Sequence, residues 1–198
     1  MKLVATVSSV EEIELATNAD VIELRLDLGK FEKRSLPDRE YIVTFRRKCD
    51  GGAYDGSDEN RLAMLRNFSD VATYVDLECD LPDSAFDDFD RPIIESYHNF
   101  NETPDYAVLR EMVENKRGDY FKVATLGRNK GDVEKIVKLL VEYDDVVAFL
   151  MGENFAYTRV LAALLDAPFV YCFVGKSKAP GQIELDRMYE ILRLAGLR

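Results

Sequence analysis

One lysine in an apolar segment has the surroundings that best suit covalent chemistry. Lys122 lies in YFKVAT (120–125), with apolar residues on both sides. Lysine is disfavoured in a strand covered on both faces, because its charge loses water of hydration. Burial and nearby cations lower the pKa of such an amine, and its free lone pair can then attack a ketone to form a Schiff base. The alternative is an edge lysine whose ammonium group reaches solvent.

The single histidine of the chain is a candidate for moving protons. His98 ends the strand-like part of IIESYHNF (93–100). An imidazole titrates close to neutral pH, so His98 beside a Schiff base could act as a general acid and base. The alternative is a structural histidine whose ring nitrogens are satisfied by hydrogen bonds within the fold.

Lys122 and His98 belong to a larger set of polar residues that stand at or near the ends of apolar segments. Residues two apart on a strand share a face, so these groups align in sets along one side. Buried charge is costly unless it is paired, and the alternative to a functional site is therefore a structural ion-pair network. The residues are Glu23, Arg25 and Asp27; Thr44 and Arg46; Asp76 and Glu78; Ser96 and His98; and Lys122 and Thr125.

Strand-like and helix-like segments alternate along all 198 residues. We expect strands at 3–7, 21–27, 41–45, 73–78, 92–98, 120–125, 146–150 and 167–173, and helices at 10–16, 58–68, 104–114, 132–143, 157–165 and 182–197. Such alternation implies parallel strands with right-handed crossovers. Eight units predict an α/β fold, a compact (β/α)8 TIM barrel in which residues 1–198 form a single catalytic domain. The alternative is an open doubly wound sheet, but the first turn, VSSVEE, lacks the expected glycines.

The last third of the chain adds two candidate ligand-binding features. Ligands of such barrels bind at the carboxyl ends of the strands. Arg159 is expected early in the helix after the seventh strand, where a guanidinium can hold a carboxylate. The loop VGKSKAPGQ (174–182) follows the eighth strand and could close over a ligand as a lid. The alternative is an ordinary connecting loop.

Composition excludes several functional classes. Asp and Glu outnumber Lys and Arg by 37 to 26, and the net charge of −11 argues against nucleic-acid or anionic-membrane binding. The apolar runs are too short for a transmembrane helix, and the amino terminus does not resemble a signal peptide, so we expect a cytoplasmic protein. The three cysteines and one histidine form no metal motif or disulfide framework. The negative net charge would repel an anionic small molecule on average, so a few arginines at the binding site would have to outweigh that repulsion.

The ordered motifs resemble the type I 3-dehydroquinate dehydratases, also called type I dehydroquinases. The matching pieces are ELRLD (23–27), TFR with a downstream GG (44–46, 51–52), DLE (76–78), SYHNF (96–100), KVAT (122–125), the spacing from Met151 to Arg159, and APGQ (179–182). They occur in the family's order and cover almost the whole chain. Each motif alone is weak evidence for the resemblance, but SYHNF, KVAT and APGQ together are specific to the family.

The resemblance implies a (β/α)8 barrel that catalyses the third step of the shikimate pathway. In the family, 3-dehydroquinate loses water by syn elimination and yields 3-dehydroshikimate through an imine. Lys122 matches the lysine that attacks the C3 ketone. His98 matches the general base that removes a C2 proton and returns a proton to the departing hydroxyl.

The resemblance also implies the substrate-binding residues. Glu23 and Arg25 match a pair that contacts substrate hydroxyls, and Arg46 matches the arginine of the third strand. Arg159 matches the arginine that binds the substrate carboxylate, and Gln182 matches the glutamine of the lid. No metal or organic cofactor is implied, and the family often forms homodimers.

Two positions depart from the family's pattern. The family has a glutamate before GG that orients the histidine; this chain has Asp50, which is one methylene shorter. Either Asp50 reaches His98 through a water or a neighbouring carboxylate replaces it. The family's lid serine aligns with Lys178. Either a small shift of the loop brings the hydroxyl of Ser177 into that place, or Lys178 adds a cation near the substrate carboxylate.

Two other functions remain as alternatives. Another class I Schiff-base lyase, such as an aldolase on the same barrel, also needs a lysine on the sixth strand. Such enzymes usually bind phosphate through glycine-rich turns after strands seven and eight, and VGKSKAPGQ does not resemble one. The second alternative is a barrel that binds a metabolite without turning it over.

Overall fold

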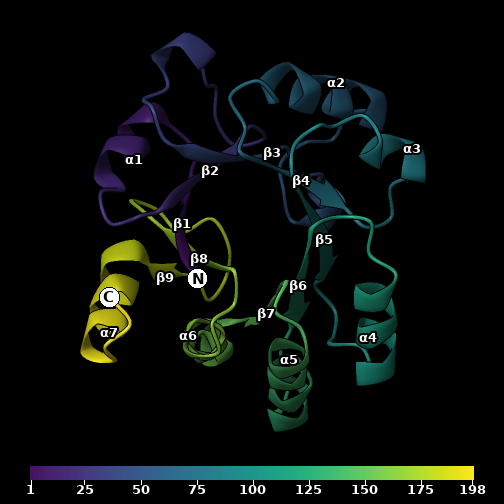
Figure 1. The fold of residues 1–198 in the computed structure, drawn as a ribbon, viewed down its shortest axis with the longest axis vertical. Coiled ribbons are helices and arrows are strands. Elements are labelled where there is room, and N and C mark those ends of the chain that lie inside the picture. Colours follow the sequence, from purple (N-terminus) through teal and green to yellow (C-terminus); the bar gives the residue numbers. More distant parts are fainter.

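The computed structural model describes all residues from 1 to 198, and its strands form one curled parallel sheet with helices on the outside (Figure 1). The strands are β1 (Lys2–Val7), β2 (Val21–Arg25), β3 (Glu40–Thr44), β4 (Tyr74–Glu78), β5 (Ile93–Asn99), β6 (Tyr120–Leu126), β7 (Val146–Met151), β8 (Phe169–Phe173) and β9 (Ile183–Glu184). The helices are α1 (Val10–Leu15), α2 (Asp58–Phe68), α3 (Asp83–Phe86), α4 (Tyr106–Glu114), α5 (Lys130–Glu142), α6 (Tyr157–Leu164) and α7 (Leu185–Leu194). This order confirms the predicted barrel class.

The sheet is continuous from β7 through β1 to β8, in the order β7-β6-β5-β4-β3-β2-β1-β8-β9. All pairings are parallel, but no backbone pairing joins β7 to β8. The amide of Leu150 in β7 instead donates to Thr158 Oγ1 of α6 at 3.0 Å. The barrel is therefore unclosed at this one junction, and the two-residue β9 extends the sheet beyond β8.

On most strands the inward face changes from apolar to polar toward the carboxyl end; on β7 it stays apolar, with Val147, Phe149 and Met151. Tyr74, Tyr120 and Phe169 meet edge to face at the amino end, with ring centroids 5.0–6.0 Å apart. Val21 and Ile42 belong to the same buried inner cluster. Because strand side chains alternate, the next inward positions toward the carboxyl end carry the polar residues of the predicted set. The apolar side chains at the amino ends of the strands form the inner core of the barrel. The polar side chains at the carboxyl ends line a cavity that can hold a ligand.

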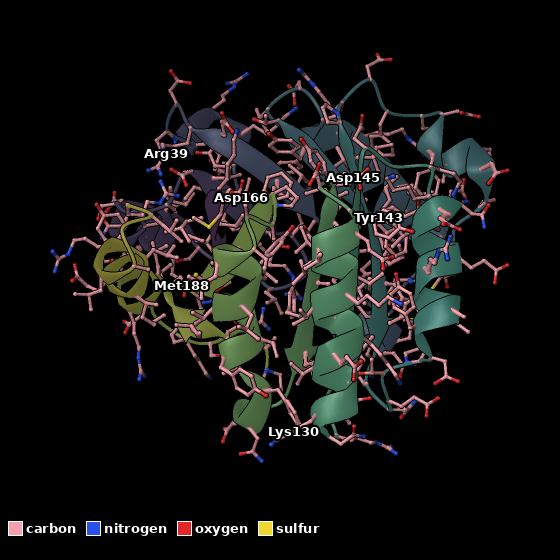
Figure 2. The ribbon with its side chains drawn as sticks, turned by 60° about the horizontal axis from the view of Figure 1, so that its bottom comes forward. Arg39, Lys130, Tyr143, Asp145, Asp166 and Met188 are labelled. Atoms are coloured by element: carbon pink, nitrogen blue, oxygen red, sulfur yellow. The ribbon has the colours of Figure 1, made fainter.

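The outward faces of the strands are covered by helices whose ends match their sequence signals. Ser57 caps α2, accepting from the amide of Asn60 at 3.3 Å. Asn129 and Asp132 form a capping box at the start of α5. Figure 2 shows α5 and α6 side by side, with Lys130 at one end of α5 and Tyr143 at the other. These caps fix where α2 and α5 begin.

Each predicted helix or strand boundary lies within two residues of the observed one except at the last helix, which also ends three residues before its predicted end, at Leu194. The helix predicted to begin at residue 182 begins at Leu185, because residues 183–184 form β9. The short helix α3 was not predicted from sequence. The helix predicted over 104–114 begins at Tyr106. None of the helices is both long and apolar enough to span a membrane.

Candidate active site

Asp76 is the centre of a buried ionic network built from β4, β5, β6 and the segment after β3. Its Oδ2 accepts a hydrogen bond from Lys122 Nζ at 2.6 Å, and its Oδ1 accepts from Arg46 Nη2 and Ser96 Oγ, each at 2.7 Å. Arg46 Nη1 also donates to Glu78 Oε1 at 2.9 Å. All five side chains are buried. The alternating pattern thus brings these groups together, and the network fixes the position of the Lys122 amine.

The amine of Lys122 is buried and its pKa is lowered from the usual value for lysine. Desolvation is the main cause, and the nearby Arg46 cation adds to it, while the Asp76 carboxylate acts in the opposite direction. Lys122 is only 4% exposed, so the edge-lysine alternative does not hold. A lowered pKa increases the share of free amine at neutral pH, which is the form that attacks carbonyl carbon.

His98 is a half-buried imidazole in the same cavity as Lys122. Desolvation, followed by the positive charges of Arg46 and Lys122, lowers the pKa of His98 well below its usual value. The ring is therefore neutral near pH 7 and can accept a proton. Its Nδ1 atom is buried without a protein hydrogen-bond partner, so the fold does not satisfy both ring nitrogens.

Glu23 and Arg25 lie side by side on β2 and line the cavity. The carboxylate of Glu23 accepts from Thr6 Oγ1 at 2.7 Å and from Thr44 Oγ1 at 3.0 Å. Arg25 makes a bidentate pair with Asp27, at 2.8 and 2.7 Å. These partners hold both side chains at the cavity wall in fixed orientations.

Arg159 is the cavity cation that has no carboxylate partner. It is 2% exposed, its Nε donates to the carbonyl of Gly181 at 2.9 Å, and its guanidinium carbon lies 3.8 Å from the centroid of the Phe149 ring. Burial lowers its pKa to about 10, so it stays charged at neutral pH. Its buried Nη1 has no protein partner. An anionic ligand group would supply the missing charge and hydrogen bonds.

The loop after β8 covers one side of the cavity. The side-chain oxygen of Gln182 accepts from the amides of Lys178 and Ala179, at 2.7 and 3.0 Å. Gly181 has a φ of 73°, and a Cβ there would lie 2.6 Å from the carbonyl oxygen of Gly152. The loop is thus held tightly against the segment that follows β7, and Gln182 both shapes the loop and lines the cavity.

The cavity has the electrostatic character of a site for an anionic ligand. Its lining holds five lysine or arginine side chains and two acidic ones, and Arg159 is the one among the five without a carboxylate partner, in a protein whose net charge is −11. Four buried side-chain nitrogen or oxygen atoms have no protein partner, and three of them belong to cavity residues: His98, Arg159 and Tyr171. Each such atom costs roughly 1–3 kcal/mol when left unsatisfied. A polar ligand that pairs with them would offset this cost.

Comparison of the sequence with known proteins assigns the chain to a family. The family model described as type I 3-dehydroquinase matches residues 4–198. The chain belongs to the type I 3-dehydroquinase family. It is 57% identical over 198 residues to the 3-dehydroquinate dehydratase of Archaeoglobus fulgidus, covering 99% of this chain and 100% of that protein. Membership makes the chain a hydro-lyase, as the sequence motifs predicted.

Solved structures agree on the fold. The 3-dehydroquinate dehydratase of Aquifex aeolicus superposes with a TM-score of 0.80 at 23% identity, covering 98% of each chain. The type I 3-dehydroquinate dehydratase of Clostridium difficile, determined with covalently modified comenic acid, gives a TM-score of 0.81 at 20% identity, covering 98% of this chain and 91% of that one. At these identities the likeness supports the barrel architecture alone.

Asp50, which stands where type I dehydroquinases have a glutamate, pairs with a neighbour on its own loop. Its Oδ2 accepts from Arg47 Nε at 2.8 Å and from Cys49 Sγ at 3.2 Å. No hydrogen bond joins Asp50 to His98, although both line the cavity. The carboxylate is therefore committed to Arg47 in this structure.

Neither alternative for the lid serine is seen at Lys178, which stands in that serine's place, or at its neighbour Ser177. Its Nζ donates to Glu12 Oε1 at 2.5 Å and so ties the loop after β8 to α1. The ammonium is therefore neutralised and is not an additional cation for a carboxylate. Ser177 does not replace the serine either, because its hydroxyl is exposed and donates to the carbonyl of Ala179 at 2.9 Å.

Arg61 supports the site but escaped the sequence analysis. It is fully buried in α2, and its Nη1 donates to Glu78 Oε2 at 2.5 Å. Glu78 thus receives bonds from both Arg61 and Arg46. A signal was present: Arg61 lies four and seven residues before Leu65 and Phe68, and all three are the buried residues of that helix.

Proposed function

We propose that the protein is a 3-dehydroquinate dehydratase of the shikimate pathway, acting as one catalytic domain through a Schiff base on Lys122 with His98 as general acid and base. The observation that carries the proposal is the common cavity of Lys122, His98 and Arg159. These groups offer a desolvated amine, a neutral imidazole and a guanidinium without a carboxylate partner. The family membership and the dehydratase from Archaeoglobus fulgidus support the choice of substrate.

The reaction begins with attack of the free Lys122 amine on the C3 ketone. The carbinolamine loses water and becomes a protonated imine, which draws electrons from the neighbouring C2–H bond. His98 takes that proton, and the electron pair moves toward the imine nitrogen to form an enamine. The enamine then expels the C1 hydroxyl, which His98 protonates, in the syn sense that the family resemblance implies. Hydrolysis of the imine restores Lys122 and releases 3-dehydroshikimate, so the net change is loss of one water.

The remaining site residues hold the substrate. Arg159 binds the carboxylate, where its unpartnered Nη1 gains an acceptor. Glu23, Arg25 and Arg46 face the cavity with fixed orientations and contact the substrate hydroxyls. Gln182 closes the site from the loop after β8. No metal or organic cofactor takes part. The cytoplasmic location and the homodimer stay predictions.

Absorbance of the product tests the reaction itself. The wild-type protein mixed with 3-dehydroquinate is expected to give a steady rise in the ultraviolet absorbance of the conjugated enone. Analysis of the carbon skeleton by mass spectrometry distinguishes the aldolase alternative. Products of carbon–carbon bond cleavage, or no change in a folded protein, would refute the dehydratase assignment.

Replacing Arg159 with glutamine should weaken substrate binding more than it slows chemistry. Hydrogen bonds to charged groups contribute roughly 1.5–3 kcal/mol, so we expect KM for 3-dehydroquinate to rise by about 10- to 100-fold with a smaller fall in kcat. Arg187→Gln, on the exposed face of α7, is the matched control and should change neither constant. An unchanged KM for Arg159→Gln would rule out its carboxylate-binding role.

Replacing Asp76 with asparagine should shift the pH dependence of kcat/KM. The Asp76 carboxylate raises the pKa of both Lys122 and His98. Its loss therefore lowers both pKa values, and the free amine and neutral imidazole persist to lower pH. We expect the acid limb of the kcat/KM profile to move to lower pH, even if the maximum falls. Thermal unfolding checks that the variant is folded; an acid limb displaced to higher pH would contradict this electrostatic arrangement.

A further inference from the structure

Tyr171 is a buried phenol at the cavity wall that no step above uses. It lies on β8, is 4% exposed, and lines the same cavity as Lys122 and Arg159. Lys122 Nζ lies 4.6 Å from the centroid of its ring, so the phenol ring packs directly beside the amine. Its oxygen is buried and has no protein hydrogen-bond partner.

The carboxylates around Tyr171 are already committed to other donors. Glu23 accepts from Thr6 and Thr44, and Asp76 accepts from Lys122, Arg46 and Ser96.

The phenol is therefore left as a donor for a ligand. Burial, together with the negative charges of Glu23 and Asp76, raises the pKa of Tyr171 well above its usual value. The hydroxyl thus keeps its proton throughout the neutral range.

We propose that Tyr171 is a substrate-positioning residue whose hydroxyl donates a hydrogen bond to an oxygen of the bound cyclic ketone, close to the carbon that Lys122 attacks. The inference rests on the proposed function. It explains why a tyrosine stands beside the lysine, where a phenylalanine would fill the same space without burying an unsatisfied hydroxyl. The bond forms only with ligand, so it contributes to binding and orientation and not to the stability of the free protein.

Tyr171→Phe separates a contribution to ligand binding from a contribution to the stability of the free protein, because it removes only the hydroxyl. In the free protein, the melting temperature is expected to stay equal or rise, since an unsatisfied polar group is lost. With 3-dehydroquinate, kcat/KM is expected to fall by about tenfold, which is the scale of one neutral hydrogen bond. The dissociation constant of quinate, which lacks the ketone and cannot form an imine, should rise by a similar factor.

Tyr41→Phe is the matched control. The hydroxyl of Tyr41 is satisfied by the carbonyl of Pro37 at 2.6 Å, on the outer side of β3. Its loss should lower the melting temperature and leave the kinetic constants unchanged. If Tyr171→Phe also lowers the melting temperature but keeps wild-type kcat/KM and quinate affinity, its role is structural and the proposal is overturned. If the wild type itself neither converts 3-dehydroquinate nor binds quinate, the proposed function fails, and the inference with it.

Discussion

Replacing Lys122 with methionine or alanine is expected to abolish conversion of 3-dehydroquinate. No other group in the cavity can form the imine, because the ammonium of Lys178 is paired with Glu12. We expect kcat to fall by about 10⁴-fold or more, the scale seen when a covalent nucleophile is removed. Enone absorbance under saturating substrate measures the loss. Lys138→Ala, on the exposed surface of α5, is the control and should retain full activity.

The fold should survive this replacement. Lys122 is one of several donors to Asp76, and Arg46 and Ser96 still pair with that carboxylate. A cooperative melting transition in the variant therefore separates lost chemistry from lost structure. Persistent enone formation by a folded Lys122 variant would leave the dehydratase assignment standing but overturn the imine mechanism.

Replacing His98 with alanine is expected to stop the elimination while imine formation continues. General acid–base catalysis typically contributes 10²–10⁴-fold, so kcat should fall by about that factor. The amine of Lys122 does not depend on a hydrogen bond to His98, since it donates to Asp76. Borohydride should therefore still attach substrate to the variant, because the imine accumulates.

Measuring both turnover and borohydride trapping in His98→Ala distinguishes a role in proton transfer from a role in imine formation. A variant that loses both would assign His98 to imine formation or to substrate binding instead of proton transfer. Melting of the free variant should change little, because the buried Nδ1 atom of His98 makes no hydrogen bond within the protein. A large drop in melting temperature would indicate a structural histidine.

The barrel and the core of its site could be predicted because both follow from local patterns. Strand alternation places Asp76, Ser96 and Lys122 on inward faces, and parallel pairing brings their strands to a common edge. The helix predicted over 58–68 forms over the same residues, because its serine cap and apolar stripe are local signals. The resemblance to the family then predicted the chemical role of each residue, which the strand pattern alone does not indicate.

Long-range pairs could not be predicted in the same way. Lys178 and Glu12 are 166 residues apart, and nothing in either segment indicates the other as its partner. The commitment of Asp50 to Arg47 depends on the shape of one loop. The missing pairing between β7 and β8 is likewise not indicated by the sequence of either strand. Each outcome is fixed by three-dimensional packing, where several partners of suitable chemistry compete.

Trapping the imine tests the central claim most directly. The wild-type protein is incubated with 3-dehydroquinate and borohydride, digested and mapped by mass spectrometry. We predict a reduced adduct on the peptide that carries Lys122, with activity lost in proportion to labelling. Enone formation without any adduct, or an adduct on a different lysine, would contradict the mechanism.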